Sequence, residues 1–189
     1  WIIKPHPANK VQNSRNGVNN EVTEEEKIIK KTFGQIPENF KILKYNNKIN
    51  SWSLYQFLDY CLTIRGTPGI ESALFGSETI LCGTGRYEKR GFSKYFKNKK
   101  DYRNYLLKLK KYPKKNYKVI KNALLYADNV FFKKPLKLDA ISVKFKKNQN
   151  ADMDLKIKFY SVKDFLDKND IIQITSWLNS KETEFYSKN

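Results

Sequence analysis

The sequence predicts an α/β fold in which a parallel sheet has helices on its faces. Short apolar, strand-like runs alternate with runs that have helical spacing over the first 82 of the 189 residues. The run at residues 60–64 is almost continuously apolar, as a strand covered on both faces would be. The connections between these runs are short, which favours neighbouring parallel strands with helical crossovers.

Each expected strand is an apolar run that ends at a turn signal. The first is stopped by Pro5 and Pro7, and the third runs into the Gly-Thr-Pro-Gly turn at positions 66–69. A segment rich in Asn, Ser and Gly at residues 9–20 indicates a loop. The four expected strands are residues 1–4, 40–43, 60–64 and 79–82.

The helices between these strands have recognisable starts and ends. Thr23 and Glu26 form a capping box before an apolar stripe, and Gly34 can end that helix. Ser51 can cap the next helix, and Pro68 suits the first position of the third.

The pattern changes after Gly83, where a glycine-rich loop runs to Phe92. We expect residues 1–112 to form one domain and residues 113–189 to form a helical and hairpin extension packed on it. After the loop we expect helices at about 101–113 and 117–132. Two alternating hairpin strands with a cationic outer face are expected at 141–146 and 155–159. A closing helix is expected to begin with a capping box at Ser161 and Asp164 and to end near residue 178.

The net charge of +18 has two interpretations. A polyanion such as nucleic acid or anionic lipid is one partner class. The favoured interpretation is compositional, because Lys, Asn, Ile, Tyr and Phe are abundant together and the lysines are scattered, as an AT-rich genome produces. The two cysteines, Cys61 and Cys82, lie in apolar runs without a CxxC pattern. We therefore expect two buried, reduced thiols in a cytoplasmic protein, and no metal site.

The turn Arg65-Gly-Thr-Pro-Gly-Ile-Glu71 is the strongest candidate for ligand binding. A strand that runs into a helix started by proline is expected to present free amides to an anion such as phosphate. Gly66 and Gly69 would let a phosphate approach the backbone, Thr67 could donate a hydrogen bond, and Glu71 could accept one from a ribose. The structural alternative is that Thr67 only caps the helix and Glu71 only complements its dipole.

His6 is the only histidine and lies between two prolines, just past an expected strand end. Ligands of open α/β sheets bind outside the carboxyl ends of the strands, so His6 and Lys4 could face the same ligand as the Gly66 turn. Lys4 could equally be a solvated strand residue.

The loop after the fourth strand carries Arg86 and Tyr87 and could cover a nucleotide or an acidic sugar. A solvated surface loop is the structural alternative.

These segments resemble a known enzyme family. Four segments resemble the C-terminal half of capsule polysaccharide biosynthesis glycosyltransferases: Lys4-Pro-His-Pro7, Thr63-Ile-Arg-Gly-Thr-Pro-Gly-Ile-Glu-Ser-Ala-Leu-Phe-Gly76, Ile80-Leu-Cys-Gly-Thr-Gly-Arg-Tyr87 and Arg90-Gly-Phe92. Those enzymes are similar to Kdo and sialic acid transferases. The resemblance covers residues 1–92.

The resemblance implies a Rossmann-like, donor-binding half of a GT-B fold that holds a CMP- or CDP-linked sugar, with no further cofactor. It implies that His6 supports the leaving nucleotide, with Lys4 beside it. It also implies that Gly66, Thr67, Gly69 and Glu71 hold phosphate or ribose. An N-terminal acceptor domain with the catalytic base would precede Trp1. The acceptor would be a glycan or a lipid-linked glycan. Separately from the resemblance, the lysine-rich surface could hold the protein in peripheral contact with the inner membrane.

Two alternatives remain at this point. CDP-glycerol glycerophosphotransferases share the His-Pro pair and a Tyr…Arg-Gly-Phe pattern, found here at Tyr87 and Arg90-Gly-Phe92. They usually have a serine-rich turn where this chain has Arg65-Gly-Thr-Pro68. A basic module that binds nucleic acid or an anionic surface is the non-enzymatic alternative, although no nucleic-acid recognition motif is present and no nucleic-acid partner is expected.

Overall fold

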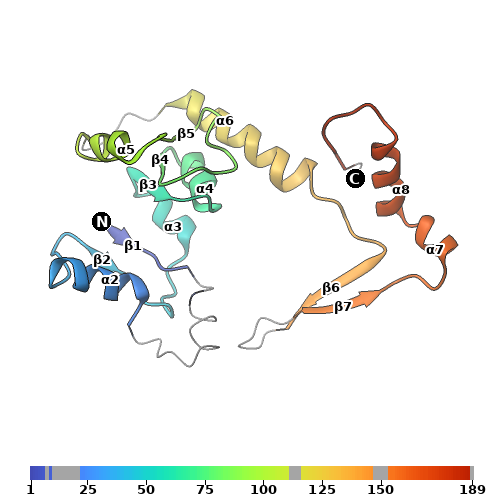
Figure 1. Cartoon of the computed structure of the whole chain (residues 1–189), viewed down its shortest axis with the longest axis horizontal. Coiled ribbons are helices and arrows are strands. Elements are labelled where there is room, and N and C mark those ends of the chain that lie inside the picture. Colours follow the sequence, from blue (N-terminus) through green and yellow to red (C-terminus); the bar gives the residue numbers. More distant parts are fainter. Residues whose placement is uncertain (7–8, 10–21, 111–115, 147–152, 188–189) are drawn as a thin grey trace. The chain divides into compact units, whose positions relative to one another are not determined.

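The computed structural model describes residues 1–6, 9, 22–110, 116–146 and 153–187 (Figure 1). The chain is mixed α/β and divides into two compact units, each built from two stretches of sequence. Unit 1 comprises Trp1–Lys48 and Leu138–Lys168, and unit 2 comprises Ile49–Lys137 and Asn169–Asn189. This division differs from the expected boundary after residue 112. The expected loop at residues 9–20 lies almost entirely outside the described residues.

Unit 1 contains a small parallel sheet and one capped helix. β1 (Ile2–Ile3) pairs with β2 (Lys41–Ile42), with Ile2 opposite Lys41. The amide of Glu26 donates to the side-chain oxygen of Thr23, 3.2 Å away, which confirms Thr23 as the cap of α2 (Glu24–Phe33). Gly34 ends α2 with a φ of 78°, a conformation that glycine adopts without steric cost.

The second stretch of unit 1 forms the expected hairpin. β6 (Ile141–Phe145) pairs antiparallel with β7 (Met153–Ile157), and the short helix α7 (Val162–Leu166) follows. Ser161 is confirmed as the cap of α7, because the amide of Asp164 donates to Ser161 Oγ. The return bond of the expected capping box differs, because the Asp164 carboxylate accepts from the amide of Tyr160, one residue before the cap.

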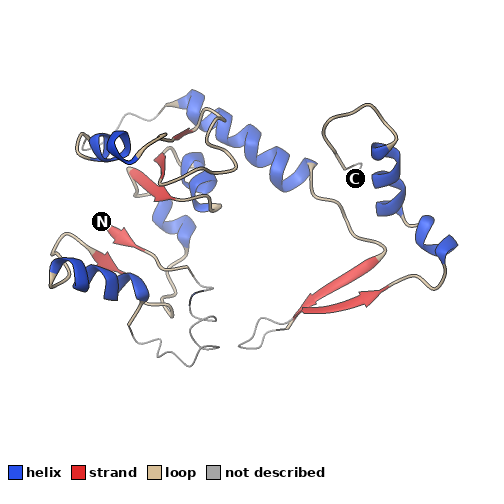
Figure 2. Ribbon diagram, viewed as in Figure 1, coloured by secondary structure: helices blue, strands red, loops and turns tan. Residues whose placement is uncertain are grey.

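Unit 2 is built around a parallel sheet in the strand order β3-β4-β5 (Figure 2). Its strands are β3 (Tyr60–Thr63), β4 (Glu78–Leu81) and β5 (Ser93–Lys94). The four strands expected to form a single sheet are therefore divided, with β1 and β2 in unit 1. Strand β5 was not expected, because two residues without an apolar run give no periodic signal.

The helices of unit 2 begin mainly at asparagine caps. Asn50 accepts from the amide of Trp52 and caps α3, so the expectation that Ser51 is the cap was wrong. Asn98 and Asn116 cap α5 and α6 in the same way, and α6 continues into the π-helix η1. Pro113, the expected end of α5, lies outside the described residues. The helices are α3 (Ser51–Tyr55), α4 (Pro68–Leu74), α5 (Lys99–Leu106), α6 (Tyr117–Asp128), η1 (Asn129–Lys133) and α8 (Asn169–Leu178).

The expected closing helix is two helices, because α7 stops at Leu166 and α8 begins at Asn169. They fall in different units.

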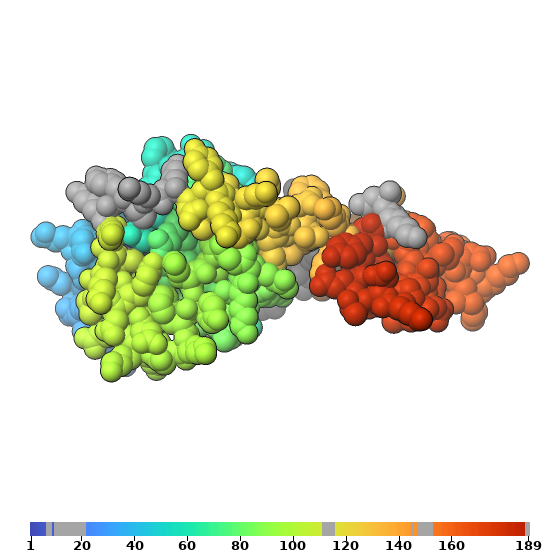
Figure 3. Space-filling model, turned by 90° about the horizontal axis from the view of Figure 1, so that it is seen from above, coloured from blue at the N-terminus to red at the C-terminus, as the bar shows by residue number. Residues whose placement is uncertain are grey.

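The core of unit 2 joins α4, β4, the loop after β4 and α6. Tyr87 stacks on Phe92 with ring centroids 5.2 Å apart, and Tyr126 packs edge-on against Tyr87. α5 has no buried residue, and Figure 3 shows the yellow-green segment that includes it forming part of the visible surface. The buried core residues are Ile70, Ala73, Leu81, Tyr87, Phe92, Ala123 and Ala127.

Candidate functional site

The turn between β3 and α4 has no free amide at positions 69–71. The N–H of Gly69 donates to the carbonyl of Gly66, and those of Ile70 and Glu71 both donate to the carbonyl of Thr67, at distances of 2.9 to 3.2 Å. Pro68 has no N–H to offer. The expectation that the helix start presents free amides to a phosphate was therefore wrong. An anion at this turn would find no amide donor at positions 69–71.

Gly66 and Gly69 have structural reasons to be glycine or small. A Cβ atom at Gly69 would lie 2.2 Å from Tyr87 Oη and 2.9 Å from Thr63 Cγ2. At Gly66 it would lie 3.0 Å from Pro68 Cδ. The Tyr87 ring thus occupies the space beside Gly69 where we expected a phosphate. The expectation that Gly69 lets a phosphate approach the backbone was therefore wrong.

Tyr87 fastens the loop after β4 to the turn after β3. Its side chain is 1% exposed, and its hydroxyl donates to the carbonyl of Gly66 at 2.7 Å. Burial raises the pKa of Tyr87, so the hydroxyl remains protonated and able to donate. Tyr87 is a core residue, and the expectation that it covers a nucleotide from a mobile loop was wrong.

The same attachment brings two exposed arginines onto neighbouring loops. A Cβ atom at Gly85 would lie 3.5 Å from Arg65 Cβ and 3.4 Å from the carbonyl oxygen of Ile64, so the two loops run against each other. Arg65 and Arg86 are both exposed. The loop is also closed internally, because the amide of Gly85 donates to the Glu88 carboxylate at 2.6 Å.

Thr67 and Glu71 keep part of their expected character. Thr67 is exposed and stands at the N-cap position of α4, but its side chain makes no capping hydrogen bond, so capping by its hydroxyl is excluded. Glu71 is half-buried beside Tyr55. Burial, followed by the charge of Glu71 and a hydrogen bond to it, raises the pKa of the Tyr55 phenol. Glu71 therefore already has one protein partner.

Lys4 and His6 belong to unit 1, and the other seven predicted site residues belong to unit 2. Both side chains are exposed, and the buried Pro5 between them anchors the backbone just after β1. The predicted site residues are thus divided between the two units. The predicted meeting of His6 with the Gly66 turn stays a prediction.

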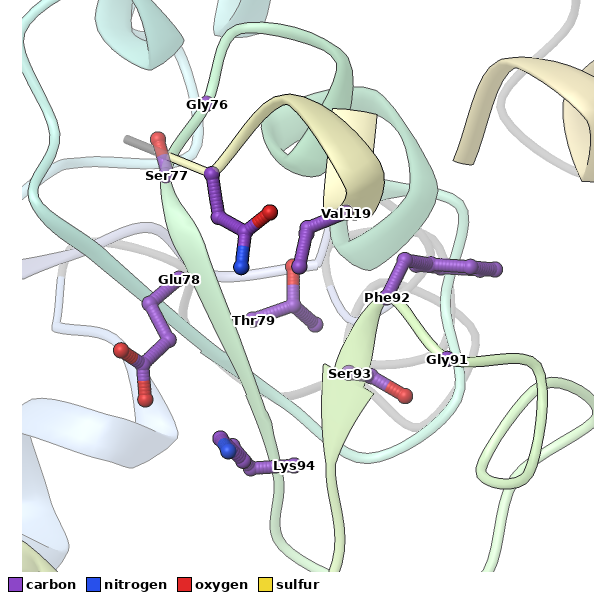
Figure 4. A pocket seen from close by; sticks show the side chains of 10 residues that line it. Gly76, Ser77, Glu78, Thr79, Gly91, Phe92, Ser93, Lys94 and Val119 are labelled. Atoms are coloured by element: carbon purple, nitrogen blue, oxygen red, sulfur yellow. The ribbon is translucent and has the colours of Figure 1, made fainter. Parts of the chain in front are cut away.

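Unit 2 has a pocket of about 320 Å³ at the end of its sheet where β4 and β5 begin, opposite to the carboxyl ends of the strands (Figure 4). It contains none of the predicted site residues. Its hydroxyls are already engaged, because Thr79 Oγ1 donates to the carbonyl of Gly69 and Ser93 Oγ donates to that of Tyr87. Glu78, on its rim, accepts a hydrogen bond from Tyr105. The pocket does not support a ligand assignment, and the exposed arginines at the carboxyl ends remain the better candidates.

The two cysteines have different environments. Cys61 is buried, and burial raises the pKa of its thiol. Cys82 is exposed, with its Sγ 3.1 Å from the hydroxyl of Tyr102, so the expectation that both thiols are buried was wrong for Cys82. Within the described ranges, no group of three or more His, Cys, Asp or Glu side chains is placed to hold a metal ion.

Comparison of the chain with protein-family models, with curated proteins and with solved structures gave no match.

Proposed function

We propose that this chain is the donor-binding, Rossmann-like part of a nucleotide-sugar-dependent glycosyltransferase for capsule or surface polysaccharide, with a CMP- or CDP-linked donor. The observation that carries the proposal is the hydrogen bond from Tyr87 to the carbonyl of Gly66. It holds together the loops that follow two adjacent parallel strands, β3 and β4. Ligands of α/β sheets bind at this end of the strands.

The exposed side chains on these loops suit an anionic ligand. Guanidinium groups bind phosphate with paired, geometrically fixed hydrogen bonds, which supports Arg65 and Arg86 as the groups that receive the donor phosphates. The Thr67 hydroxyl lies in the same turn and is exposed. Since the amides of residues 69–71 are engaged, these side chains supply the binding energy in our proposal.

His6 and Lys4 are proposed to act on the leaving nucleotide. Positive groups aimed at the phosphate would stabilise the charge that develops as the sugar leaves. Both are exposed at the carboxyl end of β1, a parallel strand, which is the position expected of ligand-binding groups.

The CDP-glycerol alternative shares the cytidine donor but loses part of its motif support. Tyr87 and Phe92, two members of the Tyr…Arg-Gly-Phe pattern, stack on each other in the core. Their presence is therefore explained by packing, and they do not discriminate between a sugar and a glycerol phosphate donor.

Thermal unfolding and calorimetric titration with CMP, CDP and inorganic phosphate test the proposal. We expect CMP or CDP to raise the melting temperature and His6→Ala to abolish the rise. The double variant Arg65→Ala with Arg86→Ala should also lose the rise in melting temperature. Its affinity for the nucleotide should fall by at least about tenfold, since each charged contact contributes about 1 kcal/mol or more. Arg103→Ala, an exposed arginine on α5, is the matched control and should bind normally.

Two different results would contradict the proposed donor site. No stabilisation by any nucleotide would refute a donor site. Tight, salt-sensitive binding of RNA or DNA at physiological salt, together with indifference to nucleotides, would favour the basic binding module.

A further inference from the structure

The β6–β7 hairpin has one aliphatic face and one charged face. Its antiparallel register places Ile141 opposite Ile157 and Val143 opposite Leu155, so these four side chains share one side of the ribbon. The alternate pairs, Ser142 with Lys156 and Lys144 with Asp154, share the other.

The β7 half of the aliphatic face is strongly exposed, whereas Ile141 is half-buried and Val143 is 36% exposed. Leu155 is 68% exposed, Ile157 is 63% exposed and the neighbouring Met153 is 58% exposed. A two-stranded hairpin is marginally stable in water by itself, so a surface of this kind normally has a partner that covers it.

The charges of the hairpin indicate an anionic partner. Its described residues carry four lysines, at 144, 146, 156 and 158, against Asp154 alone. Lys146 is paired with Asp154 at 2.8 Å, which leaves an excess of positive charge on and beside the polar face. A second copy of the chain is disfavoured as the partner, because each copy carries a net charge of +18.

We propose that the β6–β7 hairpin is a membrane-binding surface that lies in the interface of an anionic bilayer. The aliphatic side chains enter the acyl boundary, and the lysines of the opposite face lie at the level of the phosphate groups. This arrangement uses both faces of the ribbon, whereas a nucleic acid would use only the lysines. In the described part of the chain, no helix has both the length and the apolar character needed to cross a bilayer. The proposal does not depend on the donor site.

Vesicle cosedimentation tests the surface with two compositions, phosphatidylcholine alone and phosphatidylcholine with about a quarter phosphatidylglycerol. We expect binding to the anionic vesicles only. Neutralising two lysines, Lys144→Gln with Lys156→Gln, should weaken partitioning about thirtyfold, since a basic residue near the surface contributes about 1 kcal/mol. Lys118→Gln with Lys121→Gln on α6 is the matched control and should be much closer to the unmodified chain.

The aliphatic face is tested by Leu155→Ser with Ile157→Ser, which should weaken partitioning by more than about tenfold. Leu178→Ser, at a side chain of α8 that is 66% exposed, controls for the loss of an exposed leucine. Circular dichroism of each variant verifies that the fold is retained.

Insertion is separated from simple adsorption by an environment-sensitive fluorophore. In a Cys82→Ser background, a label at Leu155→Cys should brighten on vesicle binding, and a label at Ser142→Cys on the opposite face should not. Equal responses at both positions would overturn the proposal. The proposal would also be overturned if Leu155→Ser with Ile157→Ser abolished self-association and left vesicle binding unchanged. The same holds if the protein bound RNA but not vesicles, and the lysine variants abolished the RNA binding.

Discussion

The hydroxyl of Tyr87 donates to the main-chain carbonyl of Gly66, 21 residues earlier, and it does so from inside the core of unit 2. The bond joins a loop that looks solvated in the sequence to the turn with the strongest candidate binding residues. The geometry of that turn therefore depends on an aromatic side chain that contacts no ligand in our proposal.

Removal of this hydroxyl tests the dependence. Tyr87→Phe removes one of the two donors to the carbonyl of Gly66 and leaves the amide of Gly69 as the other, so we expect a loss of about 0.5 to 1.5 kcal/mol in the free energy of unfolding. Chemical denaturation measures the loss. Tyr117→Phe, at a tyrosine that is 86% exposed, should change nothing measurable.

Gly69→Ala is expected to destabilise unit 2 by about 1 to 3 kcal/mol. The added methyl group would meet Tyr87 Oη at 2.2 Å, so the ring or the turn must move. Gly83→Ala is the matched control, because its nearest neighbour is Ile64 Cγ2 at an ordinary 3.7 Å.

Combining Gly69→Ala with Tyr87→Phe removes the closest clashing atom. The double variant should be more stable than the sum of the two single losses, which a double-mutant cycle detects. Strict additivity would contradict the contact.

Acid should weaken α2 through Glu26. A hydrogen bond to Lys30, followed by contacts with Lys44, holds the pKa of this carboxyl below its ordinary 4.5. The folded state therefore binds fewer protons than the unfolded state, and the stabilisation is present above about pH 4.5 and is lost as the pH falls through the lower, folded value.

Hydrogen exchange of the α2 amides between about pH 7 and about pH 4, corrected for intrinsic rates, measures this effect. Glu26→Gln should flatten the pH dependence, and Glu38→Gln, at an exposed glutamate, should leave it unchanged.

A fragment of residues 1–112 should not fold into a stable sheet domain. It lacks α6, which supplies the buried Ala123 and Ala127 to the core. We expect no cooperative thermal transition by near-ultraviolet circular dichroism. Ala123→Asp in the full chain should destabilise the same core, because it places a carboxylate where no side-chain surface is exposed. A cooperative transition in the fragment would contradict this account.

Local signals were sufficient for most of the elements, but not for β5 or for the break between α7 and α8, and long-range packing determined the rest. The strand-helix-strand path from β3 to β4 could be predicted, because apolar runs, a proline at the helix start and short connections act within a few residues. The caps at Thr23 and Ser161 were equally local. Ser51 was preferred to Asn50 although both residue types cap helices, so that choice had no firm basis in the sequence.

The role of Tyr87 could not be predicted in this way. It lies among arginines, lysines and glycines, a composition typical of a solvated loop. Its burial depends on the absence of a side chain at Gly69, eighteen positions earlier, and on the carbonyl of Gly66, which accepts a hydrogen bond from its hydroxyl. The one available clue is Gly69 itself, whose lack of a side chain is also what a closely approaching phosphate would require.

The interleaved order of the two units has a consequence for synthesis on the ribosome. Trp1–Lys48 emerges before unit 2, but the stretch that completes its unit, Leu138–Lys168, emerges only after Ile49–Lys137. Unit 2 in turn waits for Asn169–Asn189. Trp1–Lys48 therefore waits for its partner stretch while Ile49–Lys137 is synthesised, and during that time it is exposed to chaperones and proteases.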